Sequence, residues 1–162
     1  MSTLAYAALT TKRDLAKPGT SETTAAPGVK SYVDALSALV PAEVLTLHAV
    51  IISFTTKITG DTTKIEDATT LSWAFLGLLI LAAALYATPR LLDSKWDKLD
   101  WLRVFIPPLA FAAWTMLQRA TAFDAAFPEL AQAPRTVAAL FLAVVLGALA
   151  TSLAYKADQK QP

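Results

Sequence analysis

Four apolar stretches, each long enough to cross a lipid bilayer as a helix, dominate this chain. They run roughly over residues 33–56, 71–88, 104–122 and 136–155. At about 1.5 Å of rise per residue, a helix of ~20 apolar residues crosses a hydrocarbon core of about 30 Å. The sequence therefore predicts an all-α integral membrane protein with four transmembrane helices, surrounded by the lipid bilayer.

Composition supports this class and excludes several others. Hydrophobic residues make up 55% of the 162 positions and charged residues only 17%, whereas soluble domains carry about a quarter charged residues. The chain has 14 basic and 13 acidic residues, one histidine and no cysteine, so neither a nucleic-acid surface nor a thiolate metal site is indicated. No nucleophile elbow, phosphate loop or glycine fingerprint is present. We expect no enzyme activity, no metal and no cofactor.

The distribution of basic residues predicts the orientation. An N-terminal arm and linker (residues 1–32) precedes the transmembrane domain (residues 33–155), and a short tail (residues 156–162) follows it. Ten Lys or Arg residues lie in the arm, the second loop and the tail, against four in the first and third loops. Because cytoplasmic loops are enriched in basic residues, we expect a multi-pass inner (plasma) membrane protein with both termini in the cytoplasm.

The segment before the third span has the pattern of a short interfacial helix. Residues 94–106 place an apolar face opposite basic side chains, a pattern typical of helices lying in the headgroup region. The apolar face consists of Trp96, Leu99, Leu102 and Ile106. The pair Pro107 and Pro108 then falls in the first turn of the third span, where proline is tolerated. A plain connecting loop is the alternative.

A stripe of small residues follows one face of the fourth span. It consists of Ala143, Gly147, Ala150 and Ala154, at spacings of four, three and four. Small residues let helix backbones approach closely within a bilayer. The stripe therefore predicts a helix-packing face, either within one subunit or between subunits.

The first span carries two polar stripes on nearly opposite faces. One consists of Asp34, Ser37, Pro41, His48 and Thr55; the other consists of Glu43, Thr46, Ser53 and Lys57. Pro41 removes a backbone hydrogen bond, which predicts a kink and a candidate hinge.

Glu43 is the most informative single residue because it lies about ten positions into the first span. A charged side chain at this depth costs roughly 2.5–3.5 kcal/mol, so its carboxyl should be protonated, paired or facing water. Intramembrane ionisable residues mark ion paths by default; a structural carboxylate is the alternative. His48 lies roughly 140° further round the helix. It is either a packing residue or, where water reaches it, a pH-sensitive group.

Residues 40–43 (VPAE) resemble a recurring motif of small bacterial membrane proteins. In layout alone, the chain resembles small multi-span effectors of bacterial defence systems, which implies a defence-type membrane effector. We expect a homo-oligomeric channel whose ion path includes Glu43, Thr46, Ser53 and His48, since rings of carboxylates select cations. One alternative is a membrane-anchored accessory subunit, in which the arm binds a soluble partner and Glu43 pairs with another membrane protein. Another is a small proton-coupled transporter that uses Glu43 and His48.

Overall fold

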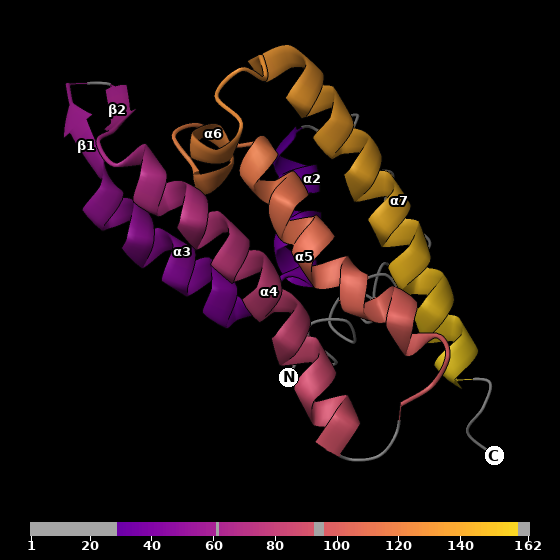
Figure 1. The fold of residues 1–162 in the computed structure, drawn as a ribbon. Helices are drawn as coiled ribbons and strands as arrows, with labels where there is room; N and C mark the ends of the chain where they lie inside the picture. Colours follow the sequence, from indigo (N-terminus) through magenta and orange to yellow (C-terminus); the bar gives the residue numbers. More distant parts are fainter. Residues whose placement is uncertain (1–28, 61, 93–95, 159–162) are drawn as a thin grey trace, which may run out of the picture.

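The computed structural model describes residues 29–60, 62–92 and 96–158, and these residues are mostly helical (Figure 1). The elements are α2 (Val29–Leu39), α3 (Ala42–Thr55), β1 (Thr56–Thr59), β2 (Thr62–Ile65), α4 (Ala68–Leu92), α5 (Asp100–Met116), α6 (Ala122–Ala126) and α7 (Gln132–Asp158). Helix α5 lies between α4 and α7, α3 runs along α4, and α2 packs against α5 and α7. The predicted arm up to residue 28 and the last four residues of the tail lie outside the described residues.

Two helices are long and apolar enough to cross a membrane. These are α4 and the segment Gln132–Leu153 of α7. The α2–α3 pair provides a third candidate if the two helices are counted as one broken span. Helix α5 has 17 residues, fewer than the ~20 that a span normally needs. The structure therefore shows a mostly helical chain with two to three candidate spans, and it does not confirm four.

The predicted first span is broken at Val40 and Pro41. Helix α2 ends at Leu39, α3 begins at Ala42, and the chain is bent by 111° between them. Pro41 has no N–H with which to continue the hydrogen-bond ladder of α2, and the buried side chains of Val40 and Val44 fix the turn in the core. The predicted kink at Pro41 is present, but the prediction of one continuous helix over residues 33–56 is wrong.

The predicted third span also differs from the structure. Helix α5 begins at Asp100 and ends at Met116, so Pro107 and Pro108 lie in its interior instead of its first turn. Interior prolines remove ladder hydrogen bonds and bend a helix, and α5 changes direction partway along its length (Figure 1). The segment predicted as a separate interfacial helix is, from Asp100 onward, the first part of α5.

A β-hairpin between α3 and α4 is absent from the all-α prediction. Strands β1 and β2 are antiparallel, with Thr59 opposite Thr62. Gly60, at the turn, has a φ of +61°, which glycine adopts without steric strain. The β-branched threonines and isoleucines of both strands favour this extended structure.

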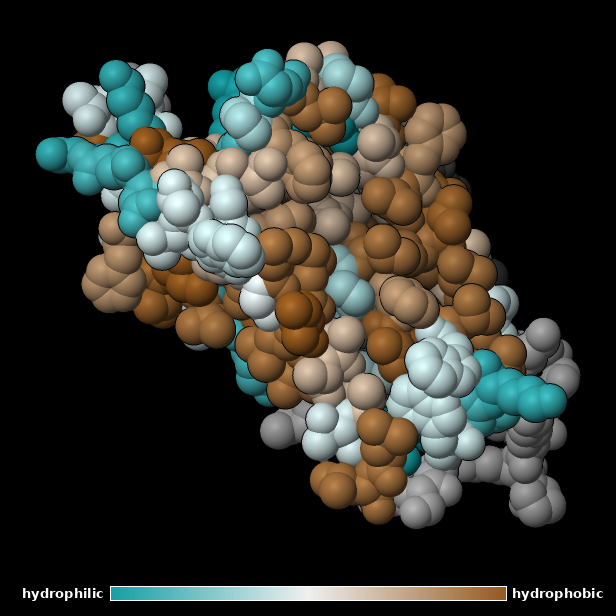
Figure 2. Space-filling view, in the orientation of Figure 1, coloured by the Kyte–Doolittle hydropathy of each residue, from teal (hydrophilic) through white to brown (hydrophobic). Residues whose placement is uncertain are grey.

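Polar groups gather at the two ends of the bundle, and apolar side chains cover the region between them. Figure 2 shows hydrophobic residues over the middle of one face, with hydrophilic residues mainly at the hairpin end and at the opposite end. On α7, Arg135 and Leu153 are 18 positions apart, which is about 27 Å along a helix. This length is close to the ~30 Å of a hydrocarbon core, so the exposed apolar belt is compatible with a lipid environment.

Candidate functional site

The two polar stripes predicted for the first span separate clearly on α3. Glu43, Thr46 and Ser53 are exposed, whereas His48 and Thr55 are buried. Residues three, four and seven apart share one face of an α-helix, which accounts for this division. We call Glu43, Thr46 and Ser53 the polar face of α3.

Glu43 is the second residue of α3, and its side chain is exposed. Among the described residues its carboxylate has neither a hydrogen bond nor an ion pair. It lies twelve positions before Thr55, about 18 Å along the helix. Glu43 therefore lies far along α3 from the hairpin, which begins at Thr56.

The two hydroxyl groups of the polar face already donate hydrogen bonds within α3. Thr46 Oγ1 donates to the Ala42 carbonyl oxygen at 2.9 Å, and Ser53 Oγ donates to the Val50 carbonyl oxygen at 2.6 Å. Each oxygen therefore keeps lone pairs that can accept a further hydrogen bond or contact a cation. Leu47 and Val50 are also exposed on α3, so polar oxygens alternate with apolar side chains along the helix.

His48 lies in the core of the subunit and does not share the exposed face with Glu43. Its side chain is only 1% exposed. The imidazole makes edge-on contacts with Phe111 and Trp114 of α5, at centroid distances of 5.3 Å and 5.5 Å. Its Nε2 atom accepts a hydrogen bond of 3.4 Å from the backbone N–H of Ala122, the first residue of α6. His48 thus joins α3 to α5 and α6.

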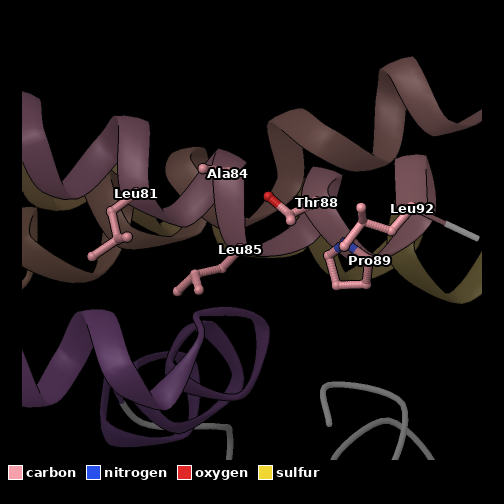
Figure 3. Close-up of a pocket in the computed structure, with 6 residues that line it drawn as sticks. All are labelled: Leu81, Ala84, Leu85, Thr88, Pro89 and Leu92. Atoms are coloured by element: carbon pink, nitrogen blue, oxygen red, sulfur yellow. The ribbon is translucent and has the colours of Figure 1, made fainter.

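A groove follows α4 beyond the start of α3. Thr55 accepts backbone hydrogen bonds from Glu66 and Asp67, so α3 and α4 run antiparallel from adjacent ends. The 14 residues of α3 cover only part of the 25-residue helix α4. The groove has a volume of about 550 Å³ and is lined by Leu81, Ala84, Leu85, Thr88, Pro89 and Leu92 (Figure 3). The N-terminal end of α3, which carries Glu43, therefore lies near the part of α4 where this apolar groove begins.

A buried carboxylate, which the sequence did not identify as special, joins three helices at one end of the bundle. Asp100 is fully buried and accepts hydrogen bonds from Arg90 at 2.9 Å, Arg103 at 3.0 Å and the Tyr86 hydroxyl at 3.1 Å. Arg103 also donates to the carbonyl oxygen of Leu153 at 3.1 Å. These bonds connect the ends of α4, α5 and α7.

The charge of Asp100 is stabilised by these donors. Burial by itself would raise the pKa of the carboxyl, but hydrogen bonds from Arg90, the Asp97 N–H, Arg103 and Tyr86 together hold that pKa well below its usual value. Asp100 precedes the predicted third span. Because its charge is matched by arginine inside the same subunit, we interpret this cluster as structural.

A second ion-pair cluster holds α6 against α7 at the opposite end of the bundle. Thr121 and Asp124 form a capping box at the start of α6, a T-x-x-D pattern that is readable in the sequence. The buried side chain of Arg135 pairs with Asp124 and bonds to Gln132. This cluster fixes the position of α6, the helix that bonds to His48.

Two of the four residues in the small-residue stripe of α7 face into the helical bundle. Ala143 and Ala150 are buried, and α7 packs against α5 and α2. A Cβ atom added at Gly147 would have no heavy atom within 4 Å, so this glycine is not at a close helix contact within the chain. The side chain of Ala154 lies outside the described residues. The structure thus places two stripe residues in intrasubunit packing.

Comparison with protein-family models, curated proteins and solved structures finds no significant match to this chain. Within the part of the chain that the structure describes, no three His, Cys, Asp or Glu side chains are grouped to hold a metal ion. The candidate site is the polar face of α3, where Glu43, Thr46 and Ser53 are exposed.

Proposed function

We propose that this protein is a small homo-oligomeric membrane channel in which the polar face of α3 lines the ion path. The observation that carries the proposal is Glu43, an exposed carboxylate without a partner among the described residues, on a surface rich in exposed apolar side chains. A charged group facing lipid costs roughly 2.5–3.5 kcal/mol. Copies of the chain arranged around α3 would give this carboxylate water or a partner in place of lipid.

A symmetric ring of subunits would contribute one Glu43 from each α3. Rings of carboxylates attract and select cations, and closed cyclic symmetry is the usual form of a homo-oligomer. Thr46 and Ser53 would add oxygen atoms about one and three turns further along α3. The polar face would then form a path with a charged ring near its middle and hydroxyl oxygens toward the hairpin.

The broken α2–α3 segment supports a site within the membrane. Discontinuous helices whose ends lie inside the bilayer are a recurrent feature of ion and substrate sites in transporters. Helix α2 is held by α5 and α7, while α3 packs on α4, so the two halves have different neighbours. Pro41, at the junction, is the position where α3 could change its angle to α2.

The proposed topology places α2–α3, α4, α5 and α7 in the membrane, with the α2–α3 pair turned by 111° at its break instead of crossing as one straight helix. The Asp100 cluster would lie on the cytoplasmic side, with both termini, and the hairpin and Asp124 would lie on the other side of the inner membrane. The charge distribution supports this orientation, since ten of the fourteen basic residues fall on the proposed cytoplasmic side and cytoplasmic loops are enriched in Lys and Arg.

Two measurements on the purified protein test the proposal. The protein part of the detergent-solubilised particle should have a mass several times the 17.3 kDa of one chain. In liposomes, the wild-type protein should conduct cations, and Glu43→Gln should lose most of the cation selectivity. Glu66→Gln is the matched control because Glu66 is exposed beside the hairpin, and it should conduct like the wild type. A particle containing one chain, or unchanged selectivity in Glu43→Gln, would contradict the channel and favour a membrane-anchored accessory subunit.

A further inference from the structure

We propose that His48 is a protonation-sensitive positioning residue that fixes α3 against α5 and α6, and thereby sets the position of Glu43. The inference deepens the proposed channel function, and its effect on conduction rests on that function. It is carried by the contacts of the imidazole, which bring together three elements distant in the sequence.

The hydrogen bond to Ala122 defines the protonation state of the ring. Because Nε2 accepts from a backbone N–H, the imidazole must be neutral and carry its proton on Nδ1. A second proton would place an N–H group at Nε2, opposite the N–H of Ala122. Two donors cannot bond to each other, so protonation removes the bond that joins α3 to α6.

Among the described residues, no carboxylate forms an ion pair with His48. The ring lies against Phe111 and Trp114, and Ala122 presents its backbone amide. The titratable and charged side chains on the elements packed around α3 are engaged elsewhere. Tyr86, Arg90 and Arg103 bind Asp100, Asp124 binds Arg135, and Lys57 pairs with Glu66.

Movement at His48 would be transmitted to the polar face because both belong to one short helix. Helix α3 has 14 residues and begins directly after the break at Pro41. The helical hydrogen bonds of α2 therefore do not continue into the N-terminal end of α3. Loss of the Ala122 bond and of the neutral ring packing would allow α3 to shift about this break. Glu43, on the opposite side of α3, would shift with it, and acidification would therefore alter conduction.

The single histidine of this chain makes the first test direct. Protein labelled with ¹⁵N in histidine, and purified without a histidine tag, should give one set of ring signals. We expect the neutral Nδ1–H tautomer at neutral pH and a doubly protonated ring on acidification, with a simultaneous change in the tryptophan fluorescence of the protein. A ring that is charged at neutral pH, that has the Nε2–H tautomer, or that stays neutral while conduction changes with pH would overturn the proposal.

Two variants separate this inference from the channel proposal. His48→Gln keeps an acceptor near the position of Nε2 but cannot take up a proton, so its ion flux should lose the pH-dependent step of the wild type. A pH step that is the same in His48→Gln would overturn the role of His48. Glu43→Gln should retain the histidine titration in the NMR spectrum even if no channel activity is found. If His48→Gln does not fold, the NMR titration of the histidine ring in the labelled wild-type protein decides the proposal.

Discussion

Glu43 and His48, five residues apart on α3, lie on opposite sides of the helix. The carboxylate is exposed, and the imidazole is buried against Phe111 and Trp114. One short helix therefore presents an ionisable group outward while holding another in the subunit core. The packing of His48 consequently determines where the polar face of α3 can lie, and the predictions below test this arrangement and the bundle that supports it.

Replacement of Asp100 by Asn should strongly destabilise the bundle. The substitution removes the negative charge that Arg90 and Arg103 share at 2.9 Å and 3.0 Å. Removal of one partner from a buried ion pair costs about 3 kcal/mol, and we expect a loss of this order in the free energy of unfolding in mixed detergent. Glu66→Gln, which removes an exposed partner of Lys57, should change it by less than about 0.5 kcal/mol. Equal effects of the two substitutions would contradict the structural role of Asp100.

The stability of the protein should also fall on acidification through Asp100. Its folded-state pKa lies below the ordinary value, which is about 3.9 for aspartate. The carboxylate therefore stabilises the fold fully above pH ~4, and this stabilisation is lost as the pH decreases below that value. Unfolding measured as a function of pH should show this component in the wild type and not in Asp100→Asn. If the free energy of unfolding falls equally with decreasing pH in the wild type and in Asp100→Asn, Asp100 does not contribute to the acid destabilisation.

The pair Asp124 and Arg135 should be energetically coupled. Arg135 is buried and paired with Asp124, so each single substitution, Asp124→Asn or Arg135→Gln, leaves the other group without its partner. We expect each to cost about 3 kcal/mol, and the double substitution to cost at least ~1 kcal/mol less than their sum. A double-mutant cycle measured by unfolding checks this, and additive losses would mean that the pair makes no energetic contact.

Two positions of the small-residue stripe should respond in opposite ways. Ala143→Leu introduces volume into the core, and overpacking should lower the free energy of unfolding by about 1–3 kcal/mol. Gly147→Ala meets open space and gains helix propensity, so stability should stay equal or rise by up to about 1 kcal/mol. Loss of the oligomer in Gly147→Leu, measured by particle mass, would instead place this part of the stripe between subunits.

The polar pattern of the first span was predictable because it depends on helical periodicity alone. The assignment of Glu43 to one face and His48 to the other agrees with their exposure in α3. The size of the bend at Pro41 was not predictable, since the 111° turn requires the packing of Val40 and Val44 in the core as well as the proline. The hairpin was detectable, because Gly60 and Asp61 between runs of Thr and Ile form a recognised turn signal.

The two ion-pair clusters depend on contacts between distant parts of the chain. Arg103 bonds to the Leu153 carbonyl fifty residues away, and the N–H of Ala122 bonds to His48 seventy-four residues away. Periodicity and composition do not report such pairings. The same limit applies to the interior prolines of α5, since Pro107 and Pro108 are accommodated by a bent helix within the bundle instead of marking a helix start.

The accessibility of position 46 tests the central claim most directly. The chain contains no cysteine, so Thr46→Cys carries a single thiol on the polar face, and Val144→Cys carries one on the exposed apolar side of α7. If α3 lines an aqueous path, a charged, membrane-impermeant thiol reagent should modify Thr46→Cys in liposomes and reduce its ion flux, while Val144→Cys stays protected by lipid. Modification of Thr46→Cys no faster than that of Val144→Cys, with flux unchanged, would contradict a water-filled path along α3.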